Sequence, residues 1–79
     1  MSRIEKLILI LKEHPCSLKY ADIEKILLHI GFEKKQGKGS HVKFSYKKTF
    51  FLFSPHNGEI KNYQKEQVSQ ILKLLSLFS

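Results

Sequence analysis

The spacing of the apolar residues changes twice along this 79-residue chain, and this restricts the folds open to it. Up to Ile30 the apolar residues recur every three or four positions, as in an amphipathic helix. After Gly31 they alternate with polar residues, as in a strand with one buried face. The helical spacing returns after Asn62. This order predicts an α+β fold in which helices cover one face of a small antiparallel sheet.

Two helices are expected before the sheet. Ser2 and Glu5 have the spacing of a capping box, and the helix that they begin ends before Pro15. A second helix is expected from about Lys19 to Ile30, where Gly31 followed by an aromatic residue is typical of a C-terminal stop.

Three strands and a last helix complete the predicted order α-α-β-β-β-α. The expected ranges are Phe32 to Gln36, His41 to Tyr46 and Thr49 to Phe53 for the strands, and Tyr63 to Leu77 for a helix capped by Asn62. In the second strand Val42, Phe44 and Tyr46 are expected to face the helices. His41 and Lys43 then share the open face of the sheet.

The third expected strand, Thr49 to Phe53, is apolar on both faces. One face belongs to the core, and two interpretations of the other stay open. Either the first helix or the C-terminal tail covers it, or it is a docking surface for a protein partner. A pure interaction protein that acts through Phe50 to Phe53 is therefore one functional hypothesis.

Positive charge is concentrated in the strand region. The net charge is +7, and the segment from Phe32 to Lys48 holds one acid, Glu33, against six lysines: Lys34, Lys35, Lys38, Lys43, Lys47 and Lys48. Such a patch attracts a polyanion, although a lysine-rich surface can also serve solubility alone. Because arginine occurs once, phosphate contacts are favoured over the reading of base edges in duplex DNA.

Several function classes find no support in the residues. Cys16 is the only cysteine and the four histidines lack paired spacing, so neither a disulfide nor a zinc site is expected, and no cofactor is predicted. The apolar run from Leu7 to Leu11 is bracketed by charges and too short to span a bilayer. We therefore expect a cytoplasmic protein that is not associated with a membrane.

The turn from Gln36 to His41 has the composition of a phosphodiester site. RNA carries its own nucleophile, the 2′-hydroxyl, so its cleavage needs only a base, an acid and positive charge near the phosphate. His41 is the candidate acid or base, and Lys35, Lys38 and Lys43 are candidates to stabilise the phosphate. A lone strand histidine is more often structural than catalytic, so a non-catalytic RNA-binding module that uses Lys35 to Lys43 stays open as an alternative.

The chain also resembles the HicA-type toxins of bacterial toxin-antitoxin systems over about Leu18 to Leu75. These toxins have a helix that ends in Leu-Gly-Phe, a Lys-Gly-Ser-His turn and strand, and a Pro-His loop. The matching runs are Leu27-Leu28-His29-Ile30-Gly31-Phe32-Glu33, Lys35-Gln36-Gly37-Lys38-Gly39-Ser40-His41-Val42-Lys43-Phe44, Pro55-His56 and Glu59-Ile60-Lys61. We expect one domain over residues 1–79, with an additional N-terminal helix in 1–14 and the HicA-like core in 18–77.

The resemblance implies a fold like that of double-stranded RNA-binding domains and a metal-independent mRNA endoribonuclease activity. It implies that His41 is catalytic and that a HicB-type antitoxin binds the toxin and blocks its active site. His56 matches a histidine often found in the family loop and is a candidate auxiliary residue. The residues predicted to bind RNA are Lys34, Lys35, Gln36, Lys38, Gly39, Ser40 and Lys43.

Overall fold

Three antiparallel strands form one open sheet with the order β1-β2-β3 in the computed structural model, which describes residues 2–77. The strands are β1 (Glu33–Gln36), β2 (Val42–Tyr46) and β3 (Thr49–Phe53). The pairing places Lys43 opposite both Lys35 and Leu52. The expected strands are confirmed with two corrections of one residue each. Strand β1 begins at Glu33 and not at Phe32, and β2 begins at Val42, so His41 lies just outside the sheet, in the turn that precedes it.

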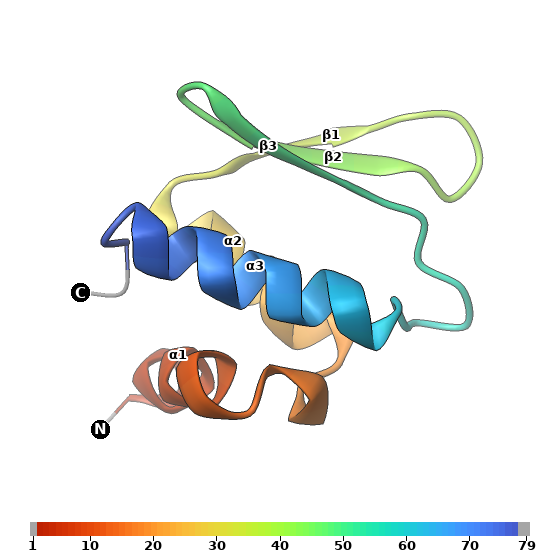
Figure 1. Cartoon of the computed structure of the whole chain (residues 1–79). Helices are drawn as coiled ribbons and strands as arrows, with labels where there is room; N and C mark the ends of the chain where they lie inside the picture. Colours follow the sequence, from red (N-terminus) through yellow and green to blue (C-terminus); the bar gives the residue numbers. More distant parts are fainter. Residues whose placement is uncertain (1, 78–79) are drawn as a thin grey trace.

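The helices all lie on one side of the sheet. They are α1 (Arg3–Glu13), α2 (Tyr20–Ile30) and α3 (Asn62–Leu74), and the short 3₁₀ helix η1 (Pro15–Ser17) joins the first two. Helices α2 and α3 lie between the sheet and α1, which packs against both of them (Figure 1). The predicted α+β class and the order α-α-β-β-β-α are confirmed, and the additional N-terminal helix forms a third layer.

Local signals explain where the first two helices begin and end. The Ser2 hydroxyl accepts a hydrogen bond from the backbone N–H of Glu5 at 3.3 Å, which caps α1. At the end of α2, Gly31 has a φ of 125°, and the backbone N–H of Phe32 donates to the carbonyl of Leu27 at 2.9 Å. The stop at Gly31 is the one that the sequence predicted, and the Ser2 bond is one of the two hydrogen bonds of the predicted capping box.

The last helix is shorter than its apolar pattern suggested. Helix α3 ends at Leu74, and Ser76 has a positive φ of 55°, which turns the chain away from the helix axis. Asn62 is the first helical residue, and Lys61 holds the cap position that was expected for Asn62. The apolar residues beyond Leu74 therefore continue the sequence pattern without continuing the helix.

The core is a layer of aromatic side chains from the sheet packed on aliphatic side chains from the helices. Every second residue of the sheet points inward, so Phe44, Phe51 and Phe53 are buried while Tyr46 stacks on Phe32 at a ring distance of 5.2 Å. Other buried members of the core are Leu11, Leu18, Ile23, Ile26, Leu27, Val42, Ile60, Val68 and Leu72. The expected inward face of β2 is confirmed.

The opposite face of the sheet has no covering layer within residues 2–77. Phe50 and Leu52 of β3 point to this open face, with side chains 54% and 63% exposed. Helix α1, one of the elements considered as a cover, lies on the far side of α2 and α3 (Figure 1). None of the helices in this part of the chain has the length and apolar content that crossing a membrane requires.

The two faces of the sheet predict opposite responses to the same substitution. Phe44→Ala removes a fully buried ring, and we expect the free energy of unfolding to fall by about 3–5 kcal/mol. Phe50→Ala is the matched control on the open face, where we expect a change of about 0.5 kcal/mol or less. Urea denaturation measures both values, and equal losses would contradict the assignment of the faces.

Candidate active site

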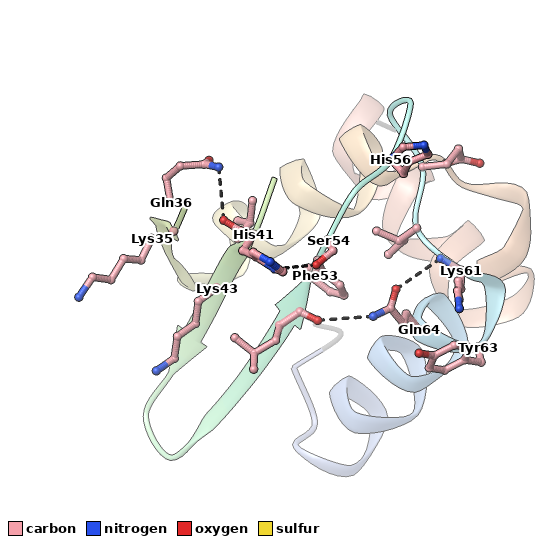
Figure 2. A pocket seen from close by; sticks show the side chains of 15 residues that line it. Lys35, Gln36, His41, Lys43, Phe53, Ser54, His56, Lys61, Tyr63 and Gln64 are labelled. Atoms are coloured by element: carbon pink, nitrogen blue, oxygen red, sulfur yellow. Dashed lines mark hydrogen bonds between the residues drawn. The ribbon is translucent and has the colours of Figure 1, made fainter. Parts of the chain in front are cut away.

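A cleft of about 900 Å³ opens at the end of the sheet where β1 leads into β2. Its walls come from the β1–β2 turn, the end of β3, the loop after β3 and the beginning of α3 (Figure 2). The polar and charged side chains that line it are Lys35, Gln36, His41, Lys43, Ser54, His56, Glu59, Lys61, Tyr63 and Gln64. Residues far apart in the sequence therefore converge on one concave surface.

Backbone hydrogen bonds of the β1–β2 turn fix the position of His41. The N–H of Gly37 donates to the carbonyl of His41 at 2.8 Å, and the N–H of His41 donates to the carbonyl of Lys38 at 3.3 Å. The side-chain amide of Gln36 donates to the carbonyls of His41 and Gly39 at 3.3 and 3.4 Å. The turn holds the His41 backbone firmly while its side chain stays exposed to solvent.

The His41 ring has one hydrogen-bond partner that sequence reasoning missed. The Ser54 hydroxyl lies 2.7 Å from Nδ1 of His41 (Figure 2). This bond occupies one ring nitrogen and orients the imidazole, so Nε2 is the nitrogen left for a substrate in the cleft. The strand register could have predicted this contact. The Lys47-Lys48 turn pairs Tyr46 with Thr49, and counting outward along both strands from that pair brings Ser54 opposite His41.

Two of the predicted RNA-binding lysines line the same cleft as His41. Lys35 and Lys43 are opposite each other in the β1–β2 ladder and share the open face. Both line the cleft together with Gln36. Paired strands therefore fix the backbone of both lysines at the edge of the cleft. Their ammonium groups extend away from the imidazole (Figure 2), and that of Lys43 lies 5.0 Å from the centroid of the Phe50 ring.

The other predicted RNA-binding residues lie elsewhere. Lys38, Gly39 and Ser40 are exposed in the turn but do not line the cleft. Lys34 lies on the helix-facing side of β1, where its ammonium contacts the carboxylate of Glu24 at 2.9 Å. The alternation of side chains along a strand separates Lys34 from Lys35, so the structure does not bring Lys34 to His41.

His56 comes to the same cleft from a second hairpin. Asn57 and Gly58 both have positive φ values, 55° and 77°, and the backbones of His56 and Glu59 exchange hydrogen bonds at 2.8 and 3.1 Å. This is the two-residue turn that favours Asn-Gly. His56 and His41 line different walls and their rings lie apart (Figure 2).

A buried lysine connects the hairpin wall to the helices. The Lys65 side chain is only 2% exposed, and its ammonium donates to a Glu59 carboxylate oxygen at 3.2 Å. The other oxygen of that carboxylate accepts from the backbone N–H of Tyr20 at the start of α2, also at 3.2 Å. Glu59 therefore links α2, α3 and the His56 hairpin, which fixes one wall of the cleft.

This ion pair was not predicted from the sequence, although the position of Lys65 in its helix indicates a buried lysine. It falls in line with Val68 and Leu72 on the buried stripe of α3, where a lysine needs a partner. Its acceptor, Glu59, comes from outside the helix, and periodicity does not identify it.

The start of α3 is also fastened to the edge of the sheet. The Gln64 side-chain amide donates to the carbonyl of Leu52 at 3.5 Å, and its oxygen accepts from the backbone N–H of Lys61 at 3.4 Å. Tyr63, which is 61% exposed, and Lys61 extend from this end of the helix along the cleft. Within residues 2–77 no group of three His, Cys, Asp or Glu side chains is placed to hold a metal ion.

The ion pair predicts a specific pH dependence of stability. The hydrogen bond from Lys65 is the largest cause that lowers the pKa of Glu59 below its ordinary value of 4.5, against an opposing effect of burial. A lowered carboxylate pKa stabilises the fold above the unfolded pKa, and this contribution is lost as the pH falls through the folded pKa. When the pH falls from 6 to 3, the melting temperature of Lys65→Met should therefore fall by less than that of the wild type.

Lys73→Met is the matched control, because Lys73 is an exposed lysine of the same helix. Thermal melts followed by circular dichroism at both pH values compare the three proteins. The control should keep the acid sensitivity of the wild type. Equal acid sensitivity in Lys65→Met would show that this ion pair does not stabilise the fold.

Comparison with known proteins adds the family to this geometry. The sequence profile described as the HicA toxin of bacterial toxin-antitoxin systems matches residues 20–77, which include α2, the whole sheet and α3. Searches among curated proteins and among solved structures gave no match. The match covers more than half of the chain and confirms the expected resemblance. The chain therefore belongs to the HicA toxin family of bacterial toxin-antitoxin systems, and this membership implies a cognate antitoxin as its partner.

Proposed function

We propose that this toxin is an endoribonuclease that cleaves single-stranded mRNA, with His41 as the group that transfers a proton. The observation that carries the proposal is an exposed imidazole, held at Nδ1 by Ser54, in a cleft whose lining also includes Lys35 and Lys43. An mRNA substrate implies that the protein acts in the cytoplasm.

The proposed reaction uses the nucleophile of the RNA itself. The 2′-hydroxyl loses its proton and its oxygen bonds to the adjacent phosphorus, while the bond from phosphorus to the 5′-oxygen breaks and that oxygen takes up a proton. The products are a 2′,3′-cyclic phosphate and a 5′-hydroxyl end. This route needs proton transfer and positive charge near the phosphate, without a metal as a required participant.

Each part of the cleft has a role in this route. Nε2 of His41 accepts the proton from the 2′-hydroxyl or donates one to the leaving oxygen, and Ser54 keeps the ring in place. The ammonium groups of Lys35 and Lys43 stabilise the negative charge that grows on the phosphate oxygens. His56 is the candidate for the second proton transfer because it lines the same cleft from the opposite hairpin.

We further propose that the cognate antitoxin is of the HicB type and inhibits the toxin by covering this cleft. The family supports the existence of an antitoxin. The exposure of His41 supports inhibition by occlusion, since a protein laid over the cleft would keep RNA from the imidazole.

Substitution of His41 separates a nuclease from a module that only binds RNA. His41→Ala should lower the rate of RNA cleavage by about 100-fold or more, the usual contribution of a general acid or base. RNA binding should persist because Lys35 and Lys43 remain. Wild-type cleavage should also continue in EDTA. Gel assays of labelled RNA measure cleavage, and fluorescence anisotropy measures binding.

His29→Ala is the control for this test, since His29 is an exposed histidine at the end of α2, outside the cleft. Its cleavage rate should equal that of the wild type. Cleavage by His41→Ala at the wild-type rate would rule out the catalytic role of His41. Wild-type protein that binds RNA without cleaving it would favour the RNA-binding module.

Ser54 is proposed as a positioning residue that acts through His41. Ser54→Ala should lower the cleavage rate about five- to tenfold, the factor that corresponds to one hydrogen bond of about 1 kcal/mol. Ser54→Thr keeps the hydroxyl and should restore most of the rate. Imidazole ¹⁵N spectra should change for His41 in the alanine variant alone. Unchanged spectra and rate in Ser54→Ala would show that the serine does not orient the ring.

A further inference from the structure

The open face of the sheet carries an exposed aromatic ring that the proposed cleavage chemistry does not use. Phe50 is 54% exposed and lies on the side of β3 that faces away from α2 and α3. Leu52 is its neighbour on the same face and is 63% exposed. The two side chains form one apolar patch on this face, and contiguous apolar patches are a feature of interaction sites.

One lysine lies over this ring, and a second lies on the same face of the sheet. The ammonium of Lys43 lies 5.0 Å from the centroid of the Phe50 ring, and Lys35 lies across from Lys43 on the same face. Glu33 is the only acid in these paired rows, on the far strand from Phe50. The aromatic ring is therefore set in a positively charged part of the sheet.

The same surface continues into the cleft. Lys35, Lys43 and Leu52 form the row of paired residues between Phe50 and Ser54, and all three also line the cleft that holds His41. Phe50 and Ser54 are four residue steps apart, a distance of about 13 Å along an extended chain. A short stretch of single-stranded RNA spans such a distance.

We propose that Phe50 is a stacking platform for a base of the bound RNA, and that Lys35 and Lys43 hold the phosphates between this base and the cleavage site at His41. The inference rests on the proposed ribonuclease function and adds a substrate subsite to it. Stacking on an aromatic side chain tolerates every base, so Phe50 contributes affinity and strand position without selecting a sequence.

The surroundings of the ring favour RNA over a protein as its occupant. The centre of a protein interface is depleted of lysine, because burial of an ammonium group is costly. Here a lysine lies directly over the ring and a second lysine lies next to it. Aromatic rings interleaved with lysines are instead typical of surfaces that bind single-stranded nucleic acid. The flexible Lys43 side chain can leave the ring for a phosphate when a base stacks there.

The test uses the full chain with His41→Ala as the parent, so that the RNA remains intact. Because the chain has no tryptophan, Phe50→Trp places a single tryptophan, which can be excited apart from the tyrosines, at the proposed platform. Two RNAs are compared, a short single strand and the same strand with abasic sugars, which keeps the phosphates and lacks bases. The normal RNA should quench the tryptophan emission, and the abasic RNA should leave it nearly unchanged.

Anisotropy titrations with the same two RNAs measure affinity. Phe50→Leu keeps an apolar side chain but removes the ring, and it should bind normal RNA about tenfold or more weakly than the parent. Phe50→Trp should keep the affinity of the parent. With abasic RNA, Phe50→Leu and the parent should bind alike. Leu9→Ala, an exposed apolar position on α1, is the control and should match the parent with both RNAs.

The inference is overturned if Phe50→Leu binds normal RNA as tightly as the parent, or if both RNAs quench the tryptophan equally. If Phe50→Leu keeps its RNA affinity but loses binding to purified antitoxin, the face is a protein-docking surface. The proposed function has its own readout, cleavage by the chain with His41 intact. Cleavage with no effect of Phe50 would reject the stacking platform alone, and no RNA binding by any form would reject both proposals.

Discussion

Burial of one face of a three-stranded sheet is the constraint on which the rest of this structure depends. Phe44, Phe51 and Phe53 turn inward onto α2 and α3, and they form much of the core. Because neighbouring residues of a strand point to opposite faces, fixing these rings fixes the residues between them as well. Lys43 and Phe50 are exposed for this reason, so the packing of the core also determines the chemistry of the open surface.

The cleft forms at the end of this sheet. There, hydrogen bonds outside the strand pairing hold the chain in place. His41 lies one residue before β2, and its partner Ser54 lies one residue after β3. The opposite wall is anchored by the buried Lys65 ammonium and the Glu59 carboxylate, which also receives the first N–H of α2. A shallow surface on a small domain thus gains a fixed shape from a few specific polar contacts.

The sequence allowed most of the fold to be predicted because the signals for it are local. Apolar residues spaced three to four positions apart identify helices, and apolar residues spaced two apart identify strands and their faces. The capping serine and Gly31 mark helix ends within short stretches of chain. The starts of β1 and β2 and the end of α3 were placed wrongly by one to three residues, because the apolar and polar patterns continue beyond the ladder or helical hydrogen bonds. Lys34 was assigned to the site by composition, although strand alternation puts it with Glu24.

The contacts that complete the site were harder to predict, since they join residues far apart in the chain. Glu59 lies in the His56 hairpin and Lys65 lies in α3, and the sequence pattern of neither segment identifies the other residue as its partner. Ser54 was reachable by extending the strand register, but only once the turn at Lys47-Lys48 is taken as a two-residue connection. The exposure of Phe50 could be predicted only with knowledge of which layer α1 joins. The packing of α1 on α2 and α3 leaves the open face of the sheet uncovered.

The central claim is that an imidazole and ammonium groups act on a phosphodiester whose nucleophile belongs to the RNA. The most direct test is to present the wild-type protein with an RNA and with the same RNA carrying 2′-O-methyl groups at the cleaved positions, and to analyse the ends that form. The account predicts 2′,3′-cyclic phosphate and 5′-hydroxyl ends from the unmodified strand and no cleavage of the methylated one. Cleavage of the methylated strand, or ends that carry a 5′-phosphate, would contradict it.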